Sequence, residues 1–285
     1  MRSNSRVPAL ALAIALGFSA TAFAQSPDRE LLFHPNLDTD LPATFDAPIV
    51  LGRAVAADPV WTRTGLWADR PEALWGLAQV EDARPPVWDP SSDTWFAWAL
   101  GMLVQVRPDG SLPVILESLP GHDFDIRAAK GLLVYRDPAR DEIVLVRLDG
   151  KNERRVLLSG FHFFNPRFSP DGTRIVVSES RAEGGHLWLI EVDGERATDL
   201  GRGEQASWSA DGRHLVFLKI DHDGHRLTAS SLYTRDIASG VERRLAVTRA
   251  HLALQPRLSP DGRFVAFVDE ETSSLMLSRL PKEVR

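Results

Sequence analysis

The sequence has no cysteine at any of its 285 positions. A chain without cysteine forms no disulfide bonds, so its fold depends on a hydrophobic core rather than on covalent crosslinks. It also has no cysteine that could carry a lipid anchor. After the first 24 residues, no apolar run approaches the roughly 18 residues of a membrane-spanning helix, so we expect no stable membrane insertion. These absences leave a globular chain that is long enough to bury a large core.

The first 24 residues have the composition of a secretory signal peptide. Arg2 and Arg6 provide a positive start, and the run 8–20, PALALAIALGFSA, is apolar but short. The small-residue sequence AFA at 22–24 is typical of a cleavage site. The sequence therefore predicts export from the cytoplasm.

Cleavage between Ala24 and Gln25 would leave 25–285 as a single domain, which we expect in a bacterial periplasm or secreted. The chain has 33 basic and 39 acidic residues, a formal net charge of −6, and loses two more positive charges with the leader. An acidic protein is poorly suited to nucleic acid or to an anionic membrane surface. We therefore expect no nucleic-acid partner.

Five segments of similar sequence recur at a regular interval. They begin at residues 86, 126, 166, 206 and 256, so their spacings are 40, 40, 40 and 50. PRFSPDGTRIVV, ASWSADGRHLVF and PRLSPDGRFVAF are the most alike, and PVWDPSSDTWFAW and IRAAKGLLVY are looser copies. A period near 40 residues is typical of an array of supersecondary units.

Each unit contains the signals of four strands. Ser-Pro-Asp-Gly favours a tight hairpin, because Pro170 presets φ and Gly172 can take a positive φ. The apolar run that follows, such as 175–177, is typical of a strand buried on both faces. A third strand ends in Asp-Gly, another hairpin signal, and a short fourth strand completes the unit. Four strands in about 40 residues describe a blade of a β-propeller.

We therefore predict an all-β fold, a β-propeller of six four-stranded blades, with five or seven as the alternatives. Five blades begin near the five repeats, and 45–80 would form one degenerate blade. The last blade lacks its fourth strand, because the chain ends soon after 274–280. An open edge is unfavourable in a ring, so an N-terminal strand over 30–35 is expected to close it.

The repeat is similar to that of TolB-type periplasmic β-propellers. The resemblance extends over 86–280 and is carried mainly by the three copies of the Ser-Pro/Ala-Asp-Gly segment. It implies a rigid ring that binds partner proteins of the cell envelope. TolB-type proteins also carry a separate α/β domain before the propeller, and 25–85 is too short for that domain and a closing blade. Contacts made by that domain are therefore not carried over.

Functional groups are expected on the variable loops of one face of the ring, because a rigid scaffold commonly presents them there. Six of the eight histidines fall in these connections, and aspartates lie beside them. The alternative is that these are ordinary hydrophilic loop residues. Phe161 and Phe163 are included as an exposed apolar anchor, with burial as the alternative. The candidate partner-binding residues are His122, Asp123, Phe161, His162, Phe163, His186, Asp221, His222, Asp223, His225, Arg226 and His251.

Six of the eight tryptophans lie between positions 61 and 98. An aromatic cluster can bind a sugar or form the centre of a protein interface. Packing between blades is the alternative that we favour, because Trp88 matches Phe168 in the repeat and Trp98 falls in a second strand.

No recognisable catalytic motif is present. The sequence has no G-x-S-x-G nucleophile elbow and no phosphate-binding glycine loop. The segment DHDGH at 221–225 lacks the glycine and glutamate spacing of a calcium loop. We therefore assign no catalytic residue, no metal and no cofactor.

The leading hypothesis is a non-enzymatic, monomeric module that binds an envelope protein or peptide. The resemblance also leaves an enzyme open, since some exported propellers with similar blades are metal-dependent lyases that act on acidic oligosaccharides. Such a carbohydrate-active enzyme would use the histidine-rich loop face, together with Gln205 or Gln255.

Overall fold

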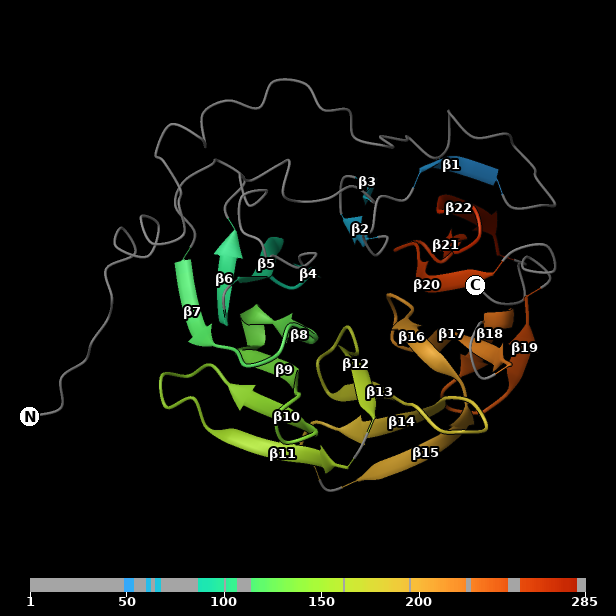
Figure 1. Ribbon diagram of the computed structural model, residues 1–285. Helices are drawn as coiled ribbons and strands as arrows, with labels where there is room; N and C mark the ends of the chain where they lie inside the picture. Colours follow the sequence, from blue (N-terminus) through green and yellow to red (C-terminus); the bar gives the residue numbers. More distant parts are fainter. Residues whose placement is uncertain are drawn as a thin grey trace, which may run out of the picture.

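A computed structural model describes most of the chain from residue 87 onward and three short strands before it. The strands of the described residues form five four-stranded sheets and one two-stranded sheet. The five sheets stand around a common centre, each with its first strand innermost (Figure 1). The predicted all-β propeller is confirmed. The described residues are 49–53, 60–62, 65–67, 87–99, 101–106, 114–160, 162–194, 196–223, 227–245 and 252–280.

Each blade runs from an inner strand to an outer one. The first blade contains β4 (Val87–Asp89), β5 (Thr94–Ala99), β6 (Met102–Val106) and β7 (Val114–Ser118). The second contains β8 (Phe124–Arg127), β9 (Leu132–Asp137), β10 (Glu142–Arg147) and β11 (Arg154–Ser159). The third contains β12 (Phe163–Phe168), β13 (Arg174–Glu179), β14 (His186–Glu191) and β15 (Ala197–Arg202).

The remaining two blades follow the same plan. The fourth contains β16 (Glu204–Trp208), β17 (His214–His222), β18 (Leu227–Asp236) and β19 (Glu242–Arg244). The fifth contains β20 (Ala253–Leu258), β21 (Phe264–Asp269), β22 (Ser274–Arg279) and, as its outer strand, β1 (Ile49–Arg53). All pairings within the blades are antiparallel.

The predicted number of blades is wrong, because the described residues form five four-stranded blades rather than six. A degenerate sixth blade was expected over 45–80. The described part of that range contains β1 and the two-stranded sheet of β2 (Val60–Thr62) and β3 (Gly65–Trp67). Strand β2 contacts the inner strands β4 and β20, so this short sheet lies between the first and fifth blades.

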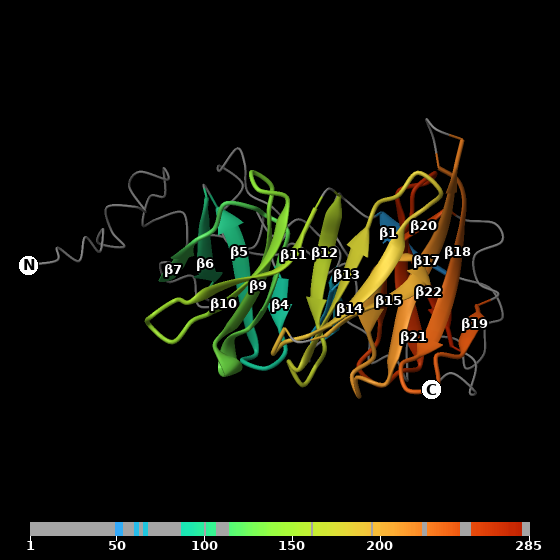
Figure 2. The same ribbon diagram turned by 90° about the horizontal axis from the view of Figure 1, so that it is seen from below.

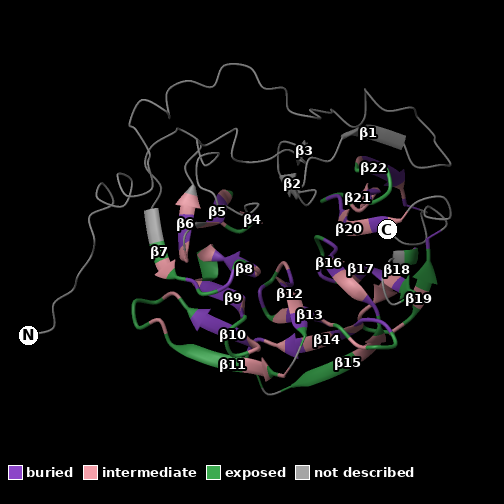
Figure 3. Ribbon diagram, in the orientation of Figure 1, coloured by how far each residue is buried: buried purple, intermediate pink, exposed green. Residues whose placement is uncertain are grey.

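The predicted closing strand is also wrong. The segment 30–35 lies outside the described residues, and β1 is the strand that pairs with β22. The reason is physical. Outer strands such as β11 and β15 are largely exposed, so they carry little of the apolar alternation that identifies a strand in a sequence (Figure 3).

The Ser-x-Asp-Gly turns between first and second strands are built by one hydrogen-bond pattern. Ser169 Oγ lies 2.5 Å from Asp171 Oδ1 and accepts the backbone N–H of Arg174 at 2.9 Å. Gly172 has a φ of 66°, which confirms the expected positive φ. The turns 209–214 and 259–264 repeat these contacts. The motif therefore fixes the same hairpin in three blades.

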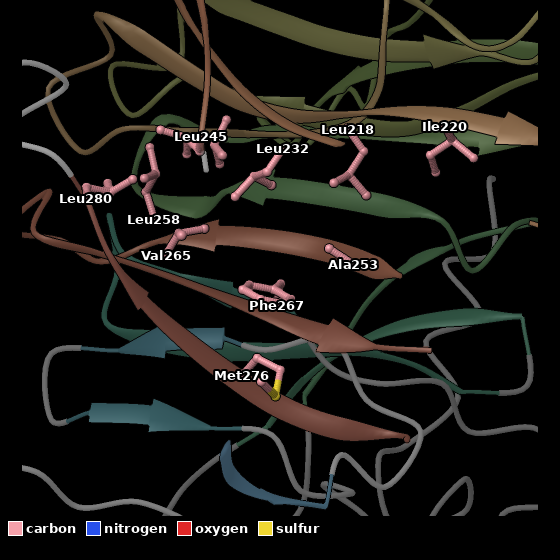
Figure 4. Packing of buried hydrophobic residues seen from close by; sticks show 11 residues of the cluster. Leu218, Ile220, Leu232, Leu245, Ala253, Leu258, Val265, Phe267, Met276 and Leu280 are labelled. Atoms are coloured by element: carbon pink, nitrogen blue, oxygen red, sulfur yellow. The ribbon is translucent and has the colours of Figure 1, made fainter. Parts of the chain in front are cut away.

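The core lies between the blades. The central residues of the second strands are buried, and Ile175, Val176 and Val177 are each at most 1% exposed. Between the fourth and fifth blades, Leu218 and Leu232 face Val265 across a layer of aliphatic side chains (Figure 4). This packing explains why the second-strand runs are apolar without alternation.

One hairpin departs from the regular blade. Strands β17 and β18 have 9 and 10 residues, whereas the other strands in the described ranges have at most 6. The hairpin projects beyond the neighbouring strands on one face of the ring (Figure 2). Among the described residues, no helix has the length and apolar character that a membrane span requires.

Candidate functional site

A cavity of about 810 Å³ lies at the centre, where the inner strands of all five blades meet. Its lining comes mainly from β4, β8, β12, β16 and β20 and the turns that follow them, with 121–123 before β8 and Arg136 and Pro138 at the end of β9. Ligand pockets in proteins commonly have volumes of about 300 to 1,000 Å³ and combine apolar walls with a few polar groups. The cavity therefore has the size and position of a binding site.

Three inner strands carry the same distortion at this cavity. Asn165, Gln205 and Gln255 have φ values of 53°, 53° and 52°. These values lie in the left-handed region of backbone conformation, which residues other than glycine rarely adopt. Each lies where the register between the first and second strands shifts. All three line the cavity. Bulges redirect side chains and are frequent beside functional sites, and backbone strain is also concentrated there.

Hydrogen bonds hold the bulges to neighbouring strands. The backbone N–H of Gln255 donates to Gln205 Oε1 at 2.8 Å. The backbone N–H of Gln205 donates to Ser178 Oγ at 3.0 Å, and that of Asn165 donates to Asp123 Oδ2 at 2.5 Å. The backbone N–H of each bulge residue thus donates to a side chain outside its own strand. These hydrogen bonds hold the cavity wall in one conformation.

A buried ion pair joins the second and third blades at the cavity wall. Arg127 Nη1 lies 3.2 Å from Asp125 Oδ1, and both side chains are less than 10% exposed. Arg127 Nη2 donates to the carbonyl oxygen of Phe168 at 2.8 Å, and Nε donates to that of Ser169 at 3.3 Å. Asp125 in turn accepts the backbone N–H of Phe168 at 2.8 Å. These contacts cross between blades, so the pair serves the structure of the ring.

Two further arginines occupy the matching place on other inner strands. Arg167 and Arg257 each follow a bulge residue by two positions, are partly buried and line the cavity. Arg167 Nη1 donates to the carbonyl oxygen of Pro166 at 2.8 Å and lies 3.5 Å from Asp123 Oδ1. The cavity wall is therefore rich in cationic hydrogen-bond donors.

Of the predicted residues that the structure describes, His122 and Asp123 line this cavity. His122 is exposed, and its ring packs edge-on against Trp98 at 6.0 Å between centroids. Trp98 itself donates from Nε1 to the carbonyl oxygen of Leu119 at 2.9 Å. Trp88 also lines the cavity and contacts Trp95 at 5.2 Å, so both tryptophans are tied into the first blade.

His186 belongs to a separate polar cluster between β14 and β15. Its Nδ1 lies 3.3 Å from Asp199 Oδ1 and 2.8 Å from Arg181 Nη1. Arg181 Nη2 is also 2.6 Å from Glu179 Oε2. Burial acts to raise the pKa of Glu179, but hydrogen bonds from Arg181 and Trp188 outweigh it and leave the pKa below its usual value. This cluster does not line the cavity.

The other predicted residues are scattered. Asp221 and His222 are exposed at the end of β17, where Asp221 forms an ion pair with Arg202, and Asp223 is exposed beside them. His162 is exposed. Phe163 is only 8% exposed and packs in the core, so it is not the surface anchor that was expected. The candidates Phe161, His225, Arg226 and His251 lie outside the described residues.

The described residues contain no group of three or more histidine, cysteine, aspartate or glutamate side chains that could hold a metal ion. Sequence reasoning concentrated on loop histidines and missed Asn165, Arg167 and Arg257. The missed signal is the repeated segment before the turn, which reads NPRFS, QASWS and QPRLS at 165–169, 205–209 and 255–259.

No family model matches the chain, and no curated protein matches it. Solved structures do. A putative TolB from Agrobacterium tumefaciens is 19% identical with a TM-score of 0.53, over 66% of this chain and 69% of that one. TolB from Acinetobacter baumannii is 15% identical with a TM-score of 0.50, over 70% of this chain and 54% of that one.

A chain from a nidogen/laminin complex is 16% identical with a TM-score of 0.50, over 66% of this chain and 71% of that one. At these identities the likenesses show the fold alone. That fold is a TolB-like β-propeller.

Proposed function

We propose that this chain is an exported β-propeller that binds a protein or peptide of the cell envelope, without catalysis, and that the ligand enters the central cavity. The observation that carries the proposal is the set of three matched bulges, which direct Asn165, Gln205 and Gln255 to one cavity. The strain recurs at equivalent positions of three blades, and all three residues line the same cavity. Preorganisation of a binding surface explains it.

The comparisons support this proposal at the level of the fold. Two of the similar structures are TolB proteins, and a third comes from a complex between two proteins. The sequence supports the location, because 1–24 have the pattern of a signal peptide and would leave 25–285 as a monomeric domain in the periplasm or outside the cell. Of the loop candidates, His122 and Asp123 remain as partner contacts at the cavity.

A photocrosslinking amino acid tests the site. It would replace Ala210, which lines the cavity and is exposed, or, as a matched control, Val156, an exposed residue on the outer strand β11. After illumination of cells of the native host, we expect a covalent adduct with a protein from Ala210 and none from Val156. Adducts of equal yield from both positions, or from Val156 alone, would show that the cavity is not the binding site.

A further inference from the structure

The cavity carries an excess of positive charge in an acidic protein. Four arginines and two aspartates line it, although the formal net charge of the chain is −6. An excess of one sign of charge on the walls of a cavity attracts groups of the opposite sign. The local charge therefore favours an anionic group on the ligand. The residues are Arg127, Arg136, Arg167 and Arg257, with Asp123 and Asp125.

The four arginines have different surroundings. Arg127 is buried with Asp125, and Arg136 Nη2 lies 3.1 Å from Asp141. Arg167 and Arg257 line the cavity from β12 and β20, two positions after the bulge residues, and Arg167 Nη1 lies 3.5 Å from Asp123 Oδ1. Guanidinium groups bind carboxylates through paired hydrogen bonds of fixed geometry, and they lose little hydration energy on doing so. These two arginines are thus the anion-binding candidates.

An amide beside Arg167 points to the same chemistry. The Nδ2 atom of Asn165 is buried and has no hydrogen-bond acceptor among the described residues. A buried donor left without an acceptor costs about 1 to 3 kcal/mol. A carboxylate in the cavity would supply the acceptor.

The rest of the lining is mixed, because Gln205, Gln255, Ser207 and Ser209 line the cavity beside apolar residues. Trp88, Phe164 and Leu258 contribute to the walls, and Pro170 and Pro260 lie in the turns at one end of the inner strands. Such walls suit aliphatic and aromatic side chains on either side of a charged one. The amide and hydroxyl side chains can donate to and accept from a peptide backbone. The combination of apolar walls, amide groups and arginines fits a peptide segment with an acidic side chain.

We infer that the cavity selects a short acidic peptide segment, whose Asp or Glu carboxylate is bound by Arg167 and Arg257 with the Asn165 amide as a further donor. The inference rests on the proposed function, because it specifies the ligand of the same site. It adds a residue preference that a general protein-binding surface would not show.

A peptide library tests it. A random-peptide display library would be selected on immobilised residues 25–285, as the wild type, as R167Q/R257Q, and as R243Q/R244Q. The last variant removes the same charge from the exposed outer strand β19. We expect peptides enriched in Asp or Glu at one position on the wild type and on R243Q/R244Q. The enrichment should disappear on R167Q/R257Q.

Affinity measurements sharpen the comparison. For the most enriched peptide, changing its acidic residue to the amide should weaken binding to the wild type by about tenfold or more, the effect of losing a charge-assisted hydrogen bond. The same change should leave binding to R167Q/R257Q unaltered. R167K/R257K keeps the charge but loses the planar fork, so it should retain the acidic preference at lower affinity. Thermal melting would verify that each variant is folded.

The outcomes separate the two proposals. Enriched peptides without an acidic preference, or with the same preference on R167Q/R257Q, would overturn the acidic-peptide inference and leave the peptide-binding function standing. No enrichment on any variant would overturn both. Binding of oligogalacturonate, tested in parallel, with no peptide enriched, would show that the arginines serve an acidic glycan, and would also overturn both.

Discussion

The side-chain oxygen of Gln205 on β16 accepts the backbone N–H of Gln255 on β20 at 2.8 Å, and both residues have a left-handed backbone. The bulge of one blade is thereby attached to the bulge of the next. The two residues stand at equivalent positions of their strands, at the register shift of each. It makes the fourth and fifth blades present their polar residues to the cavity as one surface.

This relationship predicts an unusual response to substitution at Gln205. Gln205→Ala removes the acceptor and keeps the left-handed strain, so it should destabilise the fold by about 1 to 3 kcal/mol. Gln205→Gly also removes the acceptor but relieves the strain, which is worth about 1 to 2 kcal/mol. Urea unfolding should therefore find the glycine variant more stable than the alanine variant.

Gln105 on β6 is the matched control, because it is partly buried in a strand and has no left-handed backbone. At Gln105 the alanine variant should be more stable than the glycine variant by about 0.5 to 1 kcal/mol, as is usual within strands. The same order at both positions would contradict the assignment of strain to the Gln205 bulge.

The buried pair of Asp125 and Arg127 should show strong coupling. Arg127→Met leaves the Asp125 carboxylate buried without its guanidinium partner, so it should cost about 3 to 5 kcal/mol in the free energy of unfolding. Asp125→Asn in the same chain removes that charge. The double variant should therefore be less destabilised than the sum of the two single variants.

A double-mutant cycle measured by urea unfolding gives the coupling energy directly. The exposed pair of Arg263 and Asp261 is a suitable control, since surface ion pairs contribute about 0 to 1 kcal/mol. Additive effects at Asp125 and Arg127 would mean that the two charges do not stabilise each other.

The sequence was sufficient to predict the repeated blade. The five repeat positions all fall on the inner strands or beside them, because the Ser-x-Asp-Gly turn and the apolar second strand are local signals. The outer strand β1 could not be predicted in the same way. It is only five residues long and pairs with a strand more than 200 positions away, and such long-range pairing leaves no local signal.

The site was harder to predict than the fold. Alternation along a strand predicts which side chains share a face, but a bulge reverses the alternation after it. Glutamine has no particular preference for a left-handed backbone, so Gln205 and Gln255 carried no sign of their conformation. Loop histidines were conspicuous by residue type. Their position on separate blades depends on tertiary structure, and among the loop histidines in the described ranges only His122 lines the cavity.

The aspartates of the three repeated turns should make the stability of the fold depend on pH in the acidic range. Burial acts to raise the pKa of Asp171, Asp211 and Asp261, but hydrogen bonds from the turn serines and backbone amides outweigh it and lower each pKa. A carboxylate with a lowered pKa stabilises the fold above its unfolded pKa, and that contribution is lost as pH falls below about 4.

Replacing Asp171, Asp211 and Asp261 together with asparagine should therefore lower the free energy of unfolding at pH 7, by about 1 kcal/mol for each turn. The difference in free energy of unfolding between this variant and the wild type should become smaller below about pH 4. Urea unfolding from pH 7 to pH 3 measures this. Asp193→Asn, in an exposed turn of another kind, provides a control for the removal of charge. A difference that stays constant with pH would indicate that the carboxylates contribute only through shape.

Glu204, the first residue of β16, should have the opposite pH dependence. Burial raises its pKa, and the nearby charges of His222 and Arg202 only partly offset this. The protonated Glu204 carboxyl is therefore favourable for the fold at pH values below its unfolded pKa of about 4.3. The free energy of unfolding falls as pH rises through the higher pKa that this carboxyl has in the folded protein.

Glu204→Gln should therefore stabilise the protein at pH 7 to 8. This gain in the free energy of unfolding should disappear at about pH 4, where the wild-type carboxyl is protonated. Melting temperatures across this range test the sign, and a Gln variant that is less stable than the wild type at pH 8 would show that the Glu204 charge is stabilised rather than opposed by its surroundings.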